Sequence, residues 1–227
     1  MFVATLAALG RATLDAAWSL VAPRPCAGCA EALAAHHGFC GACAASLDHA
    51  SPRAIPGLDR LVATYAFGGA VRAAIHRLKY DGAEWVAPAL ARGLGAETSS
   101  TRAGPEGPRL VVPVPLSRAR LAARGFNQAL VLARAGALGP RARLVPDGLA
   151  RRGDAADDAQ VGRSRAERFR AVAGAFHVRA PARWVGAHVV LVDDVVTTGA
   201  TLAALAAEVR RAGAQTVEAH VVASEGD

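Results

Sequence analysis

The sequence predicts an α/β domain, a mainly parallel sheet flanked by helices, with a small four-cysteine knuckle near its amino terminus. Apolar extended segments alternate with segments of helical period, which is typical of strands joined through helices. Residues 189–192 form a continuous apolar run, as expected of a central strand buried on both faces. The four cysteines of the chain all fall between residues 26 and 43.

The composition excludes several classes of protein. The chain has 227 residues, of which 52% are hydrophobic and 20% charged, so it is long enough and apolar enough to bury a core rather than remain disordered. Only 5% of the residues are aromatic, which argues against a stacking platform for single-stranded nucleic acid but does not exclude binding through charge.

The charge is strongly positive and carried by arginine. The formal net charge is +7, from 26 basic and 19 acidic residues, and Lys79 is the only lysine. Between residues 109 and 170 there are 13 arginines. This bias indicates an anionic ligand, either a phosphorylated small molecule or a nucleic-acid backbone, because guanidinium groups suit phosphate. A solvated arginine-rich surface is the alternative.

The first 25 residues are expected to form a helix rather than a membrane span. No positive segment precedes the apolar residues 1–10, and Arg11 and Asp15 interrupt the stretch that follows. A span needs about 20 nearly uncharged residues, so a short amphipathic helix over residues 1–25 is predicted, and a cytoplasmic location with reduced cysteines is expected.

Residues 26–50 are expected to form a metal-binding knuckle. The spacing is C-x2-C-x10-C-x2-C, with Gly28 and Ala42 keeping both turns small. Four thiolates satisfy tetrahedral Zn²⁺ and leave no open position, which predicts a structural zinc site. Two disulfides are the alternative for the cysteines. His36 and His37 lie in the intervening loop, either as substitute ligands or as exposed loop residues. The ligands in the predicted site are Cys26, Cys29, Cys40 and Cys43.

The remaining domain is predicted over residues 55–227 from apolar periodicity and from Gly and Pro positions. Strands are expected at 61–67, 109–115, 144–149, 189–192 and 217–222. Helices are expected at 71–78, about 84–94, 126–135 and 201–212, the last stopped by Gly213, with a solvent loop at 97–108 and a charged loop or partly helical segment at 151–170.

The strand that closes at Pro115 is followed by Ser117, Arg118 and Arg120. Hydroxyl and guanidinium groups therefore fall at the carboxyl edge of the sheet, where open α/β sheets bind ligands. Farther on, the segment Arg124-Gly125-Phe126-Asn127-Gln128 begins a helix that Asn127 is placed to cap. A turn and cap without a ligand is the alternative for this segment.

The sharpest signal follows the central strand. Asp193 and Asp194 end the buried run and supply carboxylates suited to sugar hydroxyls or to the waters of a bound Mg²⁺. A bend of small and hydroxylated residues comes next and leads into a helix whose free N–H groups point back at it. Acids for a ribose and a cradle for its 5′-phosphate describe a phosphoribosyl site. The bend comprises Val195, Val196, Thr197, Thr198, Gly199, Ala200 and Thr201.

Other phosphate-binding motifs do not account for this segment. The chain has no G-x-x-x-x-G-K-[ST] string, and no G-x-G-x-x-G follows a strand. Phosphoacceptor domains also carry paired acids at a strand end, but they need no threonine-glycine bend. An N-capped helix after a core strand, without a ligand, is the structural alternative.

The segment around Asp193 resembles the diphosphoribosyl-binding motif of type I phosphoribosyltransferases, and the resemblance extends over most of the chain. The cysteine knuckle, Lys79-Tyr80-Asp81-Gly82, Val112-Pro113-Val114-Pro115-Leu116, the Arg124–Gln128 string and the Asp193-Asp194 loop occur in this order in the ComF family of competence-related proteins. The chain is therefore identified as a member of that family, which implies a type I phosphoribosyltransferase-like fold.

The resemblance also implies roles for single residues. Asp193 and Asp194 would hold the ribose hydroxyls of phosphoribosyl diphosphate (PRPP), and residues 195–201 its 5′-phosphate. Ser117, Arg118 and Arg120 would meet the pyrophosphate, and Mg²⁺ would bridge pyrophosphate and sugar. The segment 151–170 corresponds to the flexible loop that closes over active relatives. Accessory or loop residues are Lys79, Arg124, Asn127, Gln128, Gln160 and Arg168.

The loop departs from the family pattern. Asp157 stands where a Thr is usual, Arg163 stands where an apolar residue is common, and Ala171 follows Arg168-Phe169-Arg170 in place of an Asn. These departures bear on loop closure, and hence on catalysis, more than on ligand binding.

Three functions remain open on the sequence. The first is a ComF-like protein that binds PRPP or a related phosphosugar and takes part in the uptake or handling of single-stranded DNA, with DNA-uptake proteins as partners. The second is an active phosphoribosyltransferase that uses PRPP and a nucleobase-like acceptor. The third is a non-catalytic DNA-binding adaptor in which the knuckle and the arginines act and the sugar site is idle.

Overall fold

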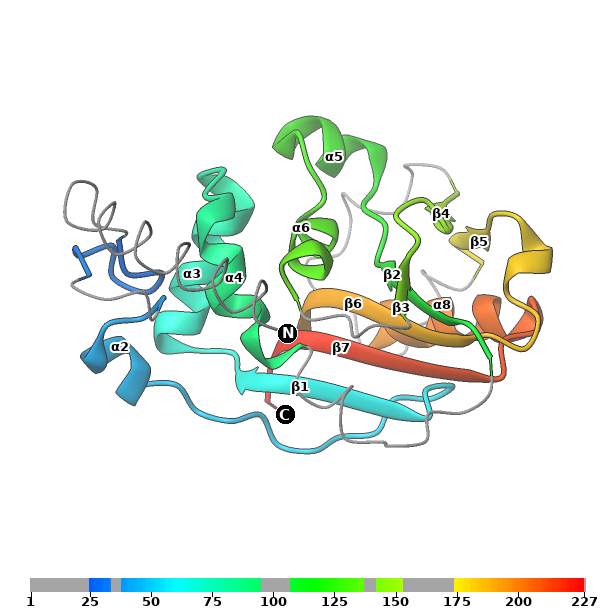
Figure 1. Ribbon diagram of the computed structural model, residues 1–227, viewed down its shortest axis with the longest axis horizontal. Helices are drawn as coiled ribbons and strands as arrows, with labels where there is room; N and C mark the ends of the chain where they lie inside the picture. The colour runs from blue at the N-terminus through cyan, green and yellow to red at the C-terminus, as the bar shows by residue number, and fades with distance from the viewer. Residues whose placement is uncertain (1–24, 34–37, 95–106, 137–141, 153–173, 227) are drawn as a thin grey trace, which may run out of the picture.

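The computed structural model describes residues 25–33, 38–94, 107–136, 142–152 and 174–226. Its centre is a parallel sheet of five strands in the order β1-β7-β6-β2-β3, which runs through the middle of Figure 1. The strands are β1 (Arg60–Ala66), β2 (Arg109–Pro113), β3 (Ala142–Leu144), β6 (His188–Val196) and β7 (Thr216–Ser224). This confirms the predicted parallel α/β fold.

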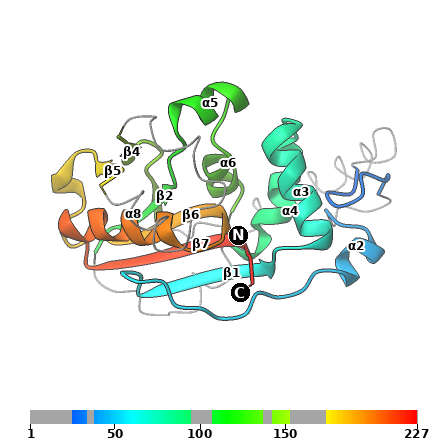
Figure 2. The ribbon, with the colours of Figure 1, turned by 180° about the vertical axis from the view of Figure 1, so that it is seen from behind.

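Helices pack on both faces of the sheet, as Figures 1 and 2 show from opposite sides. One face carries α3 (Gly69–Tyr80), α4 (Ala87–Leu90) and α6 (Gln128–Ala135), and the other carries α8 (Ala200–Arg211). The smaller elements are α2 (Gly41–Ala45), η1 (Glu84–Val86), η2 (Ala91–Gly93), α5 (Arg118–Arg124), η3 (Pro181–Arg183), and an antiparallel pair of β4 (Leu149–Arg151) and β5 (Phe176–Val178).

The alternation of side chains along the strands divides the core into two layers. In β6, Val190 and Val192 pack with the α3, α4 and α6 layer, whereas Val189 and Leu191 pack with the α8 layer. Apolar residues on both faces explain why this strand reads as an uninterrupted apolar run.

The connections reverse direction between β2 and β6, and the edge of the sheet at the carboxyl ends of these two strands is here called the crevice. The chain leaves β2 through α5 and α6 and returns at β3 on one side, and it leaves β6 through α8 and returns at β7 on the other side. The neighbouring carboxyl ends of β2 and β6 therefore form the point where the strand order reverses, which is where open α/β sheets bind ligands.

Most predicted elements are confirmed with bounds that differ by a few residues, and two expectations are corrected. The helix expected over 84–94 is broken into η1, α4 and η2, because Pro88 has no N–H to continue the hydrogen bonds of the preceding turn. The strand expected over 144–149 is two strands separated by a turn at 145–148, closed by a bond from the Gly148 N–H to the Val145 carbonyl.

Several expectations lie outside the described residues or remain untested. The helix over 1–25, His36 and His37, most of the loop 97–108 and nearly all of 151–170 fall outside the described ranges. The division into 1–25, 26–50 and 55–227 stays a prediction. Within the described ranges every helix is too short or too polar to cross a bilayer.

Candidate functional site

The paired acids lie inside β6 rather than after it, because the strand continues to Val196. Their environments differ. Asp193 is half-buried, whereas Asp194 is only 4% exposed. The sequence predicted the same role for the two carboxylates, whereas the structure shows that their environments differ.

Asp194 is held from two neighbouring helices. Its Oδ2 forms an ion pair with Nζ of Lys79, near the end of α3, and its Oδ1 accepts a hydrogen bond of 3.5 Å from Nε2 of Gln128, at the start of α6. Gln128 Oε1 in turn accepts a 2.7 Å bond from Arg124. A buried carboxylate requires partners of this kind, because an uncompensated charge is costly in the interior.

The same contacts join motifs that lie far apart in the sequence. The guanidinium of Arg124 lies over the ring of Tyr80, 5.3 Å from its centroid, and Tyr80 directly follows Lys79. Asp194, Lys79, Gln128, Arg124 and Tyr80 thus form one continuous cluster above the carboxyl end of β6. Four of these five residues were expected at the site, and the structure brings them together.

Asp193 is electrostatically strained. Burial, together with the negative charge of neighbouring Asp194, raises the pKa of Asp193 well above its ordinary value. Its Oδ1 accepts a 2.9 Å hydrogen bond from the backbone N–H of Asp194, which opposes the rise only in part. Such a carboxyl gains from an added hydroxyl donor or cation.

The bend after β6 has the shape of an anion cradle. Gly199 takes the left-handed conformation, with φ of 79°, and α8 begins at the next residue. The first-turn N–H groups of a helix have no acceptor within it, and α8 has no acidic residue in its first turn. Thr197 is exposed at the rim, and the Thr198 hydroxyl accepts a 3.4 Å bond from the Ala200 N–H.

The segment before β1 also reaches this bend, which no sequence motif predicted. Nη1 of Arg53 donates a 2.7 Å hydrogen bond to the carbonyl of Thr197. Ile55, which is 4% exposed, packs against Gly199, where an added Cβ would lie 2.7 Å from Cδ1 of Ile55. An isolated arginine and isoleucine in an irregular segment match no motif.

The loop after β2 uses its polar residues for structure. Ser117 is buried and caps α5, its hydroxyl accepting from the Arg120 N–H at 3.3 Å, while Arg118 and Arg120 are exposed on that helix. The sequence did not predict α5. The expected Asn127 cap is confirmed: its Oδ1 accepts from the Ala129 N–H at 2.9 Å. Gln160 and Arg168 lie outside the described residues.

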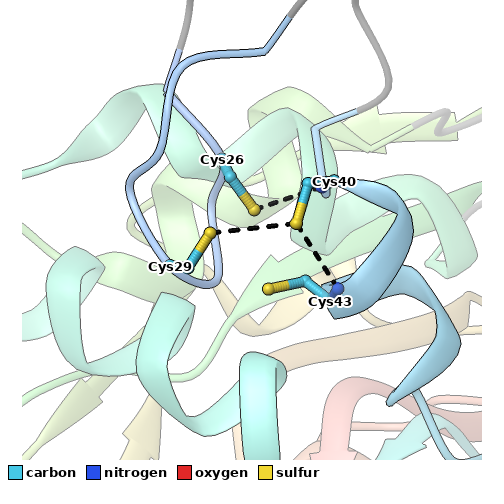
Figure 3. Close-up of side chains that lie close together, drawn as sticks. All are labelled: Cys26, Cys29, Cys40 and Cys43. Atoms are coloured by element: carbon cyan, nitrogen blue, oxygen red, sulfur yellow. Dashed lines mark hydrogen bonds between the residues drawn. The ribbon is translucent and has the colours of Figure 1, made fainter.

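The four cysteines gather at the far end of the molecule, beside α3. Their sulfur atoms all lie within 4.8 Å of one another and point toward a common centre in Figure 3. The sulfurs of Cys29 and Cys40 are 3.8 Å apart, and a tetrahedral ion with Zn–S bonds of about 2.3 Å sets its sulfurs about 3.8 Å apart. All four cysteines are free thiols. The cluster therefore fits a metal ion such as zinc.

The thiols differ in acidity. Burial acts to raise the pKa of Cys26, but backbone N–H groups that donate to its sulfur outweigh burial and lower the pKa to about 6. Burial and the neighbouring thiols raise the pKa of Cys43 to about 12. Cys26 is accordingly the more acidic of these two thiols.

The knuckle is packed onto the domain. Cys26, Ala27 and Phe39 belong to the same apolar layer as α3 and α4. Nη1 of Arg77 in α3 donates to the backbone carbonyls of Ala27, at 2.8 Å, and of Gly28. A metal held here would therefore fix one end of α3.

Comparison with known proteins agrees with this geometry. Residues 147–227, which include β6, the bend and α8, match the model of the phosphoribosyl transferase domain. The chain is 33% identical over 211 residues to the "DNA utilization protein YhgH" of Salmonella typhimurium, which covers 85% of this chain and 87% of the relative. It is 34% identical over 168 residues to the protein of the same description from Escherichia coli K12, covering 72% and 71% of the two chains.

The chain belongs to the ComF family.

For this ComF protein, the long alignment with the Salmonella relative supports the family as much as the domain match does. The phosphoribosyl transferase match begins after β3, whereas the Salmonella relative aligns over most of the chain. The predicted family and the phosphoribosyltransferase-like fold are thus both confirmed. The roles of single residues are proposals.

Proposed function

We propose that this ComF protein binds PRPP or a related ribose 5-phosphate ligand in the crevice beside the carboxyl end of β6. One observation carries the proposal: at the point where the strand order reverses, Asp193 and Asp194 are followed directly by a glycine bend that opens into the N-terminus of α8. This order supports the proposal, because carboxylates can accept from sugar hydroxyls and helix N-terminal N–H groups can donate to a phosphate at the same edge of the sheet.

The two acids take different parts in this proposal. Asp193 is the half-buried one, and a ribose hydroxyl or Mg²⁺ would relieve its unfavourable charge. Asp194 is already paired with Lys79 and Gln128, so it holds α3 and α6 against the site and carries less of the ligand contact.

The phosphate would be held by the bend, residues 195–201. The first-turn N–H groups of α8 and the positive end of its dipole favour an anion there, and Thr197 and Thr198 add hydroxyl donors. The expected pyrophosphate residues Arg118 and Arg120 lie exposed on α5, on the β2 side of the same crevice. Their part in binding remains a prediction.

We infer a role in the handling of single-stranded DNA from the relatives described as DNA utilization proteins and from the net charge of +7. A cationic protein releases counterions when it binds a nucleic-acid backbone, so the affinity for a single-stranded oligonucleotide should fall steeply with salt. If this affinity is unchanged when Asp193 and Asp194 are both replaced by Asn, DNA binding is independent of the sugar site and the adaptor function is favoured.

Calorimetric titration with PRPP and Mg²⁺ tests the ligand, with ribose 5-phosphate and pyrophosphate as separate arms. Asp193→Asn should weaken PRPP binding about 10-fold or more, because a charge-assisted hydrogen bond contributes about 1.5–3 kcal/mol. The matched control is Asp59→Asn, which removes one negative charge before β1, at the opposite edge of the sheet. Equal PRPP affinities for Asp193→Asn and the wild type would contradict the proposal.

Product formation decides between binding and transfer. Phosphoribosyl transfer needs no protein nucleophile, only positioning, neutralisation of the leaving pyrophosphate and exclusion of water. Incubation with PRPP, Mg²⁺ and a set of nucleobases should therefore release pyrophosphate if the protein is a transferase. If the protein binds PRPP but releases no pyrophosphate, PRPP has a sensing or structural role rather than a catalytic one.

We also propose that the four cysteines hold a structural zinc ion. Zinc fits their all-sulfur ligand set and the 3.8 Å spacing of Cys29 and Cys40, and four ligands leave no position for a substrate.

A further inference from the structure

We infer that Arg53 is a positioning residue for the phosphate bend: it turns the peptide between Thr197 and Thr198 so that the Thr198 N–H points into the cradle. This rests on the proposed function of residues 195–201. Arg53 lies 144 residues before Thr197 in the sequence, in the segment that links the cysteine knuckle to β1.

The first argument is the set of hydrogen bonds that Arg53 makes. A single nitrogen, Nη1, donates to the Thr197 carbonyl at 2.7 Å, to the Glu225 carbonyl at 3.2 Å and to Oγ of Ser224 at 3.4 Å. Ser224 ends β7, the strand next to β6, and Glu225 follows it. Arg53 thus fastens the bend to the end of the neighbouring strand.

The second argument is the planarity of the peptide. In a trans peptide the carbonyl of one residue and the N–H of the next point in opposite directions. Because the Thr197 carbonyl faces Arg53, the Thr198 N–H faces the other side of the bend. Among the described residues this N–H makes no hydrogen bond within the protein, so it is available to an anion.

The third argument is the support beneath Gly199. Ile55, two residues after Arg53, fills the space that a side chain at Gly199 would need, with its Cδ1 and Cγ1 2.7 and 2.9 Å from an added Cβ. The backbone of the bend therefore approaches the 53–55 segment closely. Arg53 sets the Thr197–Thr198 peptide, and Ile55 limits how far Gly199 can move.

This geometry predicts a selective effect on ligands. Loss of the Arg53 bonds frees the Thr197–Thr198 peptide to turn, which removes one donor from the 5′-phosphate but touches nothing on the pyrophosphate side. All of these Arg53 bonds come from one nitrogen and do not need the paired nitrogens of a guanidinium. The ammonium group of a lysine can therefore replace it.

The matched control is Arg210, which anchors the same linking segment at its other end. Its guanidinium donates to the Gly57 carbonyl at 2.9 Å and to Oδ2 of Asp59 at 2.7 Å, at the amino end of β1 and away from the bend. Arg210→Met removes the same charge and two hydrogen bonds, against the three that Arg53 makes. It should lower stability without changing ligand affinity.

Calorimetry with ribose 5-phosphate and with pyrophosphate tests the inference. Arg53→Met should weaken the affinity for ribose 5-phosphate about 10-fold and leave the affinity for pyrophosphate within about 2-fold of wild type. Arg53→Lys should keep both affinities within about 3-fold of wild type, and Arg210→Met should match the wild-type affinities. In ¹⁵N spectra of the ligand-free protein, the Thr198 amide should shift in Arg53→Met and not in Arg210→Met. If Arg53→Met does not fold, Arg53→Gln replaces it with the same expected loss.

The outcomes separate the inference from the proposed function. If the wild type binds neither ribose 5-phosphate nor PRPP, the proposed function fails and this inference fails with it. If the wild type binds ribose 5-phosphate and Arg53→Met binds it equally well, or weakens both ligands alike, the positioning role is overturned and the proposed site stands.

Discussion

At the scale of single residues, the two adjacent aspartates of the site have different partners. Asp194 is compensated by Lys79 and Gln128, whereas Asp193 has only the Asp194 N–H as a hydrogen-bond donor among the described residues. Burial and the charge of Asp194 outweigh the favourable charge of Lys79, so ionised Asp193 is a cost to the free protein. Asp193 therefore marks a position where folding stability has been given up, as is common at binding sites.

The pH dependence of stability follows from this cost. The pKa of Asp193 is raised in the folded state, so between the ordinary pKa of about 3.9 and the raised value the folded protein holds a proton that the unfolded chain has lost. Stability therefore falls as pH rises through this window. Asp193→Asn removes the effect, so its urea unfolding midpoint should exceed that of wild type by more at pH 7.5 than at pH 4.5. An equal difference at both pH values would contradict the assignment.

At the scale of elements, each polar cap fixes the path of the chain around the crevice. Asn127 accepts from the Ala129 N–H to start α6, and its Nδ2 donates at 3.0 Å to the carbonyl of Val114, directly after β2. One side chain thus couples the end of a central strand to the helix that carries Gln128. The capping half of this role was predictable from the sequence, and the bond to Val114 was not.

Two substitutions at Asn127 separate these contributions. Asn127→Ala should lower the free energy of unfolding by about 2 kcal/mol, from loss of a cap worth about 1 kcal/mol and of a hydrogen bond worth about 1 kcal/mol. Asn127→Asp keeps the capping oxygen and loses the donor. In urea titrations its stability should therefore lie between Asn127→Ala and wild type. If the two variants are equally unstable, the cap contributes nothing.

At the scale of the whole molecule, the knuckle and the sheet share one apolar layer. Cys26, Ala27 and Phe39 pack with α3 and α4, and α3 also carries Lys79 of the site. The cysteine cluster at one end and the crevice beside β6 are therefore joined through a single helix, visible on the left of Figure 1.

Metal removal should consequently weaken the domain and not only the knuckle. Cys26→Ser should abolish bound zinc in elemental analysis and lower the melting temperature, because the variant loses one of the four proposed ligands, whose side chain also lies in the core. Restoring zinc to chelator-treated wild type should recover the melting temperature. Wild-type protein that contains no metal and melts at the same temperature after chelation would show that the cluster is not a zinc site.

The sequence predicted what repeats locally and missed what depends on tertiary contact. The β6 strand, α8 and the Asn127 cap each have a local signature in apolar period or cap chemistry, and the cysteine spacing predicted the cluster. The burial of Asp194 depends on helices that come from elsewhere in the chain. The contacts of Arg53 and Ile55 with the bend span more than 140 residues, so no local pattern encodes them.

The most direct test of the account is a crystal structure of the protein grown with PRPP and Mg²⁺. The account predicts the 5′-phosphate within hydrogen-bond distance of the backbone N–H groups of residues 198–201, and the ribose hydroxyls against Asp193. A ligand bound elsewhere, or a crevice that stays empty when PRPP is in large excess, would contradict the phosphoribosyl site.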